Sequence, residues 1–212
     1  MAETTLRNLL YSLPKTEIHL HLEGLASVET VWNLVQKYNL ELPGIKSKKD
    51  LRHRFEVKSL DDFIDLFINV IQNSFHEVDD ISLLMKDLNN YLKENNIIYA
   101  EVFFAPSKFL TNGFDFQEMI AILENGSKEI YSKEKRNVKF IIDVSRTSGV
   151  ENAKKNLDLT IKYKTENIIG IGLGGAEVKG PAKHFQDVFK KAKKSNLHLV
   201  AHAGEVVGPE SI

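Results

Sequence analysis

The hydrophobic pattern alternates, through most of the chain, between short, almost fully apolar runs and longer segments with apolar residues at helical spacing. Short apolar runs between polar residues are typical of strands buried on both faces, and strands that alternate with helices favour a parallel sheet. We therefore predict parallel strands in sequential order. The five predicted strands are Thr16–Leu22, Ile97–Phe104, Val138–Val144, Ile168–Leu173 and Leu197–Ala203.

Segments outside these strands carry apolar residues every three or four positions, which is the spacing of an amphipathic helix. Ser27 and Ser59 stand before two of these segments as N-caps. The stretch 41–58 is rich in charge, so we predict an irregular segment whose basic cluster is solvated surface. The predicted helices are Thr4–Ser12, Val28–Tyr38, Leu60–Ile71, Asp79–Glu94, Phe116–Ser132, Val150–Tyr163 and Ala182–Ser195.

The composition is that of one globular domain. No repeat or low-complexity linker divides the chain, so we expect a single domain over residues 1–212. Hydrophobic residues make up 42% of the chain and charged residues 27%, as in ordinary globular proteins. The 28 basic and 29 acidic residues nearly balance, which favours a small neutral ligand over a nucleic acid or an anionic membrane.

The chain has no cysteine, which excludes disulfides, thiolate nucleophiles and any metal site built on sulfur. A metal would have to be held by His, Asp or Glu. The N-terminus has no apolar run that could form the centre of a signal peptide, and no stretch of about eighteen consecutive apolar residues occurs. These features predict a cytoplasmic protein.

Two histidines and two carboxylates lie together in the short extended stretch Thr16–Gly24. Side chains alternate along a strand, so His19 and His21 should point to one face, about 7 Å apart, while Ile18 and Leu20 pack on the other. Neutral imidazole suits zinc, which in a catalytic site takes about three protein ligands and a water. A surface strand with two histidines would explain the pattern equally well, so the downstream residues must decide.

Polar residues gather where the predicted strands end, and this is the edge at which parallel α/β proteins assemble their active sites. The strand Leu197–Ala203 carries His202 near its end, and Glu205 follows three residues later. His202 can supply a third imidazole beside His19 and His21. Glu205 can supply an acid or base next to them.

Other strand ends carry residues with structural explanations. Glu101 and Asp143 are expected to have a structural role in the interior, hydrogen-bonded to neighbours or to metal ligands. The glycine-rich turn Gly172–Gly175 lacks the Lys-Ser/Thr pair and the spacing of a nucleotide-phosphate loop. Close approach of its backbone to a ligand explains the glycines better.

Four segments together resemble the adenosine deaminase family of the amidohydrolase superfamily. The His-x-His and His-Ala-Gly-Glu segments are specific in combination, and the other two support them. The resemblance implies a zinc ion held by His19, His21 and His202, on a TIM-like (β/α) barrel that is incomplete here, with about five of eight strands. The segments, in the order of the family, are Pro14–Gly24, Tyr99–Pro106, Gly170–Glu177 and His202–Glu205.

The same resemblance implies roles for three further residues. Glu205 would donate a proton to the purine ring nitrogen beside C6, while the zinc ion would activate water as the nucleophile. Gly175 would give its backbone N–H to the purine. Glu23 would bind substrate where family members commonly have an Asp that binds the ribose 5′-hydroxyl.

The implied reaction is zinc-dependent hydrolytic deamination of a 6-aminopurine, and adenosine to inosine plus ammonia is the first expectation. Because Glu23 replaces the usual Asp, adenine or a modified adenine nucleoside is the alternative substrate. Another metal-dependent amidohydrolase also stays open. Many of those use a carboxylated Lys after the fourth strand, however, where this chain has Gly172–Gly175.

The family also needs a His and an Asp beyond the fifth strand, and this chain ends at Ile212 before either. We therefore expect an inactive, N-terminal part of a longer barrel. The first and fifth strands would have unpaired edges, and such edges favour self-association. The expected partners are thus a purine substrate and, through those edges, a second protein chain.

Overall fold

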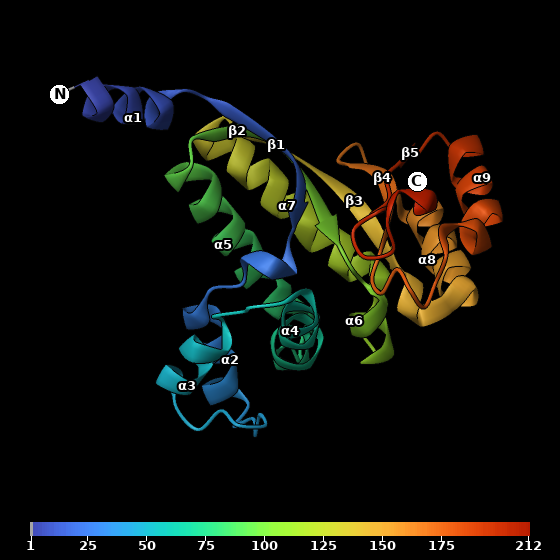
Figure 1. Ribbon diagram of the computed structural model, residues 1–212, viewed down its shortest axis with the longest axis horizontal. Helices are drawn as coiled ribbons and strands as arrows, with labels where there is room; N and C mark the ends of the chain where they lie inside the picture. The colour runs from blue at the N-terminus through green and yellow to red at the C-terminus, as the bar shows by residue number, and fades with distance from the viewer. Residues whose placement is uncertain (1) are drawn as a thin grey trace.

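The computed structural model describes residues 2–212, with side chains from residue 5 onward. At its centre lies a five-stranded sheet in the order β1-β2-β3-β4-β5, and every neighbouring pair is parallel (Figure 1). The predicted number, direction and order of the strands are therefore confirmed. The strands are β1 (Lys15–His21), β2 (Ile97–Phe104), β3 (Asn137–Ser145), β4 (Ile168–Gly174) and β5 (His198–Leu199).

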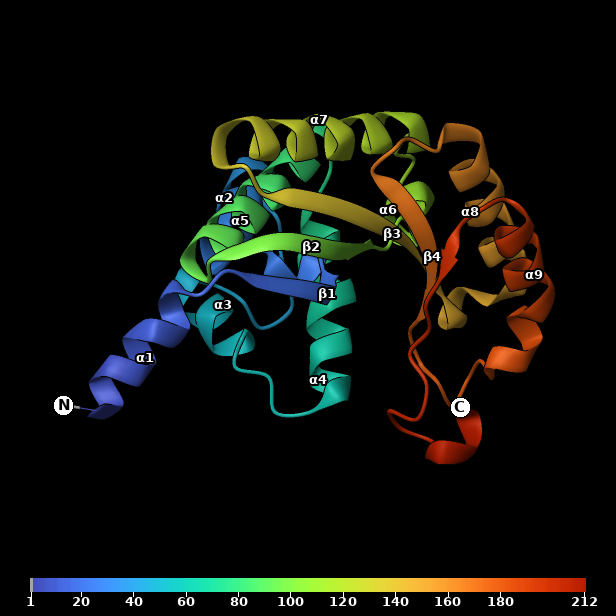
Figure 2. The same cartoon turned by 90° about the horizontal axis from the view of Figure 1, so that it is seen from above.

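Helices cover the outer side of the curved sheet. In Figure 2, α5, α7, α8 and α9 lie along this side, while α4 and the C-terminal residues lie on the inner side. In the described part of the chain, no helix is both long and apolar enough to cross a membrane. The helices are α1 (Ala2–Ser12), α2 (Val28–Lys37), α3 (Lys48–Arg54), α4 (Leu60–Asp65), α5 (Ile81–Glu94), α6 (Ser107–Thr111), α7 (Phe116–Glu134), α8 (Gly149–Tyr163) and α9 (Gln186–Lys194).

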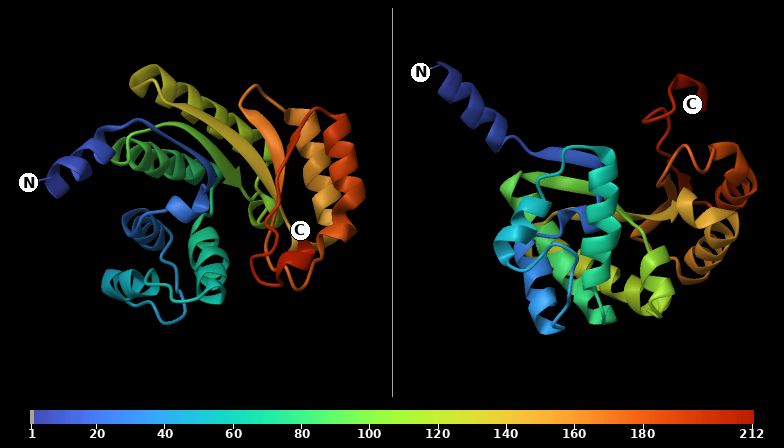
Figure 3. Two further views of the ribbon diagram at one scale, coloured as in Figure 1. Left: turned by 45° about the horizontal axis from the view of Figure 1, so that its top comes forward. Right: turned by 60° about the horizontal axis from the view of Figure 1, so that its bottom comes forward.

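Short helical turns connect many of these elements. Five are 3₁₀ turns, and the sixth, η2, is a π-helix that continues directly from α4. Helix α1 projects from the body of the molecule with its apolar side chains exposed (Figure 3). The turns are η1 (Glu23–Leu25), η2 (Leu66–Gln72), η3 (Val78–Asp80), η4 (Arg146–Ser148), η5 (Ala182–Phe185) and η6 (Pro209–Ser211).

The interior strands are buried on both faces, which explains their nearly continuous apolar sequences. Phe104 on β2, Ile142 on β3 and Ile171 on β4 are each 0% exposed. One face of each strand packs under the helices, and the other faces the inside of the curve. This rigid layer fixes the positions of the residues at the carboxyl ends of the strands.

The stretch 41–58, predicted to be irregular, contains helix α3, and the prediction is wrong there. The N-cap Ser47 accepts a hydrogen bond from the backbone N–H of Asp50, and basic residues complement the helix dipole in the last turn. Leu51 is the one fully buried side chain of this helix. A single apolar anchor shows no periodicity, so the hydrophobic pattern could not indicate the helix.

The two edge strands differ in detail from the predicted ones. Ile18 was expected to pack inward, but it is 64% exposed, and it lies where the pairing of β1 with β2 shifts register, between Glu17 and Leu20. The regular part of β5 is His198–Leu199, which is shorter than the predicted Leu197–Ala203. Edge strands have one hydrogen-bonded neighbour, so their regular geometry is less strongly enforced.

The predicted helix Leu60–Ile71 is divided into α4 and the π-helix η2. π-helical geometry is rare and is frequently found at functional sites. At the end of η2, the Gln72 amide donates to the Ala105 backbone oxygen at 3.2 Å and to Glu23 Oε1 at 3.3 Å. The π-helix therefore connects α4 to the carboxyl ends of β1 and β2.

Candidate metal centre

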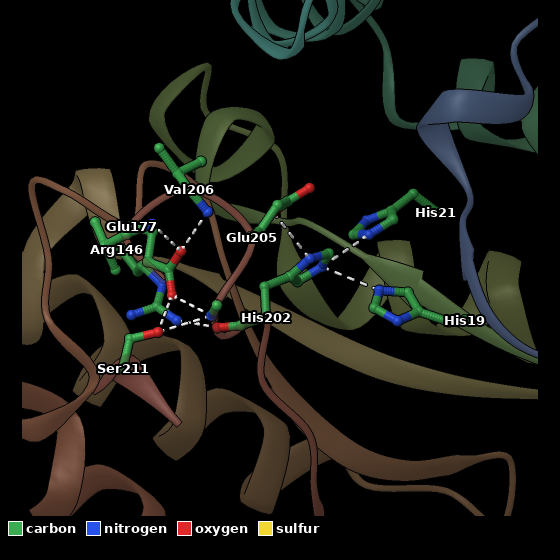
Figure 4. A network of polar contacts seen from close by, with 10 residues as sticks. His19, His21, Arg146, Glu177, His202, Glu205, Val206 and Ser211 are labelled. Atoms are coloured by element: carbon green, nitrogen blue, oxygen red, sulfur yellow. Dashed lines mark hydrogen bonds and ion pairs between the residues drawn. The ribbon is translucent and has the colours of Figure 1, made fainter. Parts of the chain in front are cut away.

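Three histidine rings converge at the carboxyl end of the sheet (Figure 4). His202 Nε2 lies 3.0 Å from His19 Nε2 and 3.2 Å from His21 Nε2. Tetrahedral zinc with bonds of about 2.0–2.1 Å places its ligand atoms roughly 3.3–3.4 Å apart. The three nitrogens are thus arranged closely enough to share one ion.

Backbone pairing brings these rings together. His19 and His21 alternate along β1 and therefore point to the same side. Beyond the regular part of β5, the chain still pairs with β4: Val200 N donates to the Ile171 oxygen at 3.1 Å, and His202 N donates to the Leu173 oxygen at 3.0 Å. His202 is therefore held by the same sheet that holds the other two histidines.

Two of the three rings, His19 and His21, are held in the neutral form that metals bind. Burial, followed by the proximity of His202 and His19, lowers the pKa of His21 to about 4. Burial and His202 also lower the pKa of His19, although Glu205 opposes this effect. A neutral imidazole has a lone pair for a metal, so His19 and His21 can coordinate an ion near neutral pH.

The ring of Phe103 on β2 packs against two of the histidine rings. Its ring stacks on His19, with centroids 4.5 Å apart and planes inclined by 21°, and lies 5.0 Å from the His21 ring. Phe103 is 0% exposed, so its own position is fixed by the core. This role could not be predicted from the sequence, because an aromatic residue in an apolar strand gives no signal of what its face contacts.

Glu205 lies beside His202, and Gly175 lies in the turn after β4. Glu205 Oε2 is 3.5 Å from His202 Nδ1, and its side chain is 45% exposed. Gly175 follows β4 with φ of +85°, and an added Cβ would lie 3.0 Å from Ser145 Oγ. This backbone conformation favours glycine, and Gly175 itself is exposed.

Glu23, the third residue expected to serve substrate or catalysis, is buried instead of lying at the open mouth. Its Oε1 accepts hydrogen bonds from Ala105 N at 2.9 Å and from the Gln72 amide at 3.3 Å. Its Oε2 has no partner among the described residues. Burial raises the pKa of this carboxyl to about 7, against the opposing effect of the hydrogen bonds.

Asp143 lies near the carboxyl end of β3, in space that glycines on β4 leave free. A Cβ added to Gly172 or Gly174 would come within 2.8 Å and 2.6 Å of its carboxyl oxygens. Asp143 is 6% exposed, and burial together with the nearby Glu23 raises its pKa to about 8. This agrees with the expected location in the interior.

Arg146, directly after β3, joins two of the loops around the site. Its Nη1 donates to the Gly180 oxygen at 2.8 Å, and its Nη2 donates to the His202 oxygen. Arg146 is 3% exposed. It thus fixes the backbone of a histidine whose ring belongs to the cluster, a contact between distant segments that sequence spacing does not indicate.

Comparisons with known proteins agree on one family for this chain. Residues 14–212 match the family described as Adenosine deaminase. The chain is 33% identical over 205 residues to an adenine deaminase of Wolinella succinogenes, covering 95% of this chain and 60% of that protein. It is 30% identical over 207 residues to an adenine deaminase of Hahella chejuensis, covering 98% and 61%. The chain therefore spans about 60% of the length of these curated relatives.

Solved structures match at the level of the fold. The crystal structure of an adenine deaminase from Arthrobacter aurescens superposes with a TM-score of 0.85 at 25% identity, covering 93% of this chain and 59% of that one. A zinc-bound amidohydrolase from Burkholderia ambifaria gives a TM-score of 0.83 at 20% identity, covering 94% and 54%. At that identity, the second match supports the fold alone.

Proposed function

Because this chain belongs to the adenosine deaminase family, we propose that it forms the metal-binding part of a hydrolase that releases the 6-amino group of a purine as ammonia. The observation that carries the proposal is the convergence of the Nε2 atoms of His19, His21 and His202. The chain spans about 60% of its curated relatives, so the activity is proposed for the complete barrel.

Adenine is the substrate that we propose. From the sequence alone, adenosine comes first and adenine is the alternative. The names of the similar curated proteins support the alternative, because both relatives described above are adenine deaminases. The residue Glu23, in place of the Asp common in the family, agrees with a substrate that has no ribose 5′-hydroxyl to bind.

Zinc is the metal that best fits the donor set. Three imidazoles suit a tetrahedral ion with one open position, and the chain has no cysteine that would favour a softer site. A zinc ion held there would lower the pKa of a bound water toward neutrality, which is the chemistry that hydrolysis requires. His19, His21 and His202 would hold it.

We assign the remaining roles to Glu205 and Gly175 and to the buried Glu23. Glu205 donates a proton to the ring nitrogen beside C6, which makes C6 electrophilic. Its position 3.5 Å from His202 Nδ1 supports this role, because an acid must lie next to the reacting atoms. The backbone N–H of Gly175 orients the purine, and Glu23 contacts the substrate through the oxygen that has no protein partner.

Substitution of Glu205 and of His202 tests the proposal in the complete protein. Glu205→Gln keeps the shape but cannot cycle a proton, so kcat for ammonia release from adenine should fall by about 10²- to 10⁴-fold while zinc content is retained. His202→Ala should lose zinc and activity together. The measurements are zinc content and kcat with adenine and with adenosine.

The outcomes separate the parts of the proposal. Near-normal turnover of Glu205→Gln would refute its role as proton donor and leave the metal site standing. Retention of zinc by His202→Ala would instead refute the metal site. A higher kcat/KM for adenosine than for adenine would overturn the choice of substrate.

A further inference from the structure

The carboxylate of Glu177, which lies after β4, is bound to the segment that carries Glu205. Its Oε1 accepts from Gly204 N at 2.7 Å and from Ser211 Oγ at 2.6 Å. Its Oε2 accepts from Val206 N at 2.9 Å, with a longer bond from the next backbone N–H. Glu177 is 4% exposed, so these bonds form away from bulk water.

Glu205 lies between two of these anchored groups. Gly204 precedes it and Val206 follows it, and both donate their backbone N–H to the same carboxylate. Figure 4 shows the bond from Val206 to Glu177 and the Glu205 side chain beside His202. Gly204 also has φ of +73°, which turns the chain sharply at this point. The side chain of Glu205 is therefore left to point away from Glu177, toward His202.

The charge on Glu177 suits this arrangement. Hydrogen bonds from Ser211 and from the backbone N–H groups hold the pKa of its carboxyl at about 2, so it is ionised near neutral pH. Charged acceptors form stronger hydrogen bonds than neutral ones do. The turn 203–207 is thus fixed by a buried anion on one side, while Arg146 fixes the His202 oxygen on the other.

We propose that Glu177 is a positioning residue for the proton donor: it holds the turn 203–207 so that the Glu205 carboxylate stays beside His202. This inference rests on the proposed function of Glu205. Glu177 itself contacts neither the histidine cluster nor, by its burial, a substrate at the mouth. Its effect on the reaction is therefore indirect and should appear in the rate more than in binding.

The test is Glu177→Gln in the complete protein. Glutamine keeps the size but loses the charge, and its amide nitrogen cannot accept from a backbone N–H. Misplacement of a reacting group by about 1 Å can cost roughly 10²-fold in rate. We expect kcat with adenine to fall about 10- to 100-fold, with KM and zinc content little changed and with an altered pH profile of kcat.

Glu124→Gln is the matched control. Glu124 is also a mostly buried carboxylate that holds a loop, since its Oε2 accepts from Thr165 Oγ at 2.7 Å and from Asn167 Nδ2 at 3.1 Å. That loop precedes β4, at the opposite end of the strand from the site. Glu124→Gln should therefore keep kcat and its pH profile, even where it lowers stability.

A double variant shows whether Glu177 acts through Glu205. Glu177→Gln should cause little further loss of kcat when Glu205→Gln is already present, because the group that it positions is gone. Should Glu177→Gln fold poorly, Ser211→Ala removes one donor to the same carboxylate, and we expect a smaller loss of kcat in the same direction.

Each result is decisive. Normal kcat in Glu177→Gln or Ser211→Ala, beside an impaired Glu205→Gln, would overturn this inference and leave the proposed function intact. Equal losses in Glu177→Gln and Glu124→Gln, or additive losses in the double variant, would show a merely structural role. Normal kcat in Glu205→Gln would refute the proposed role of Glu205, and this inference with it.

Discussion

Asp143→Asn should change how the stability of the chain depends on pH. Asp143 is buried at the carboxyl end of β3, and its Oδ1 has no hydrogen-bond partner among the described residues. Burial raises its pKa from 3.8 to about 8, the Glu23 carboxyl adds to this effect, and the Arg146 guanidinium opposes it. Asparagine has nearly the same shape and does not titrate.

The size of the effect follows from the two pKa values. Because the folded pKa is raised, the protonated carboxyl favours folding fully below pH 3.8, and this contribution is lost as the pH rises toward about 8. A shift of about four pH units, at about 1.4 kcal/mol each, sets an upper limit of roughly 6 kcal/mol. Between about pH 5 and 7, the difference should grow by roughly 3 kcal/mol.

Urea unfolding of the chain at about pH 5, 6 and 7 measures how the free energy of unfolding depends on pH. A chelator is included so that metal binding by the histidines does not add its own pH dependence. The free energy of unfolding of Asp143→Asn should increase relative to the unsubstituted chain as the pH rises. Asp143→Ala is the control, because it adds a constant loss from the cavity but should follow the same slope.

A constant difference between Asp143→Asn and the unsubstituted chain across this range would refute the reasoning. Asp143 would then be ionised in the folded chain, and the space left by Gly172 and Gly174 would have to contain a counterion or water. Different slopes for the two variants would mean that a neighbouring group, such as Glu23, titrates in response to the substitution.

Two further substitutions address the site. Gly175→Ala places a Cβ at φ of +85° and 3.0 Å from Ser145 Oγ. We therefore expect the free energy of unfolding in urea to fall by about 1–3 kcal/mol and the KM for adenine to rise. Unchanged values of both would contradict the importance of this turn. Phe103→Leu removes the ring contacts with His19 and His21, each worth about 0.5–1.5 kcal/mol. Zinc affinity, measured by competition with a chelator, should therefore fall roughly 5- to 150-fold. Equal zinc affinity in Phe103→Leu would mean that the backbone alone orients the rings.

The fold could be predicted wherever burial produces a clear pattern of apolar residues in the sequence. The runs Ile97–Phe104 and Ile168–Leu173 are apolar because both of their faces are covered, so strand number, direction and order followed from the sequence. The pattern failed where a single contact decides the structure. Leu51 anchors a helix without periodicity. Ile18, which alternation placed inside, is exposed at the irregular part of β1.

The candidate site could be predicted for groups whose chemistry is visible in the residue type. Imidazoles two residues apart on a strand point to a metal, and the structure brings His202 to them. The supporting residues could not be predicted in this way. Phe103 and Glu177 act through what their side chains touch in the folded chain, and those contacts join segments that are far apart in sequence.

Because of the order of the strands, the histidine cluster joins the two edges of the sheet. β1 and β5 are the two outermost strands, yet the Nε2 atoms of His19 and His202, 183 positions apart in sequence, are 3.0 Å apart. An ion bound to both would cross-link the two ends of the sheet over nearly the whole chain, and the entropy of closing such a loop grows with its length. Metal loading would then be coupled to the curvature of the sheet, and a metal-free chain would be freer to flatten.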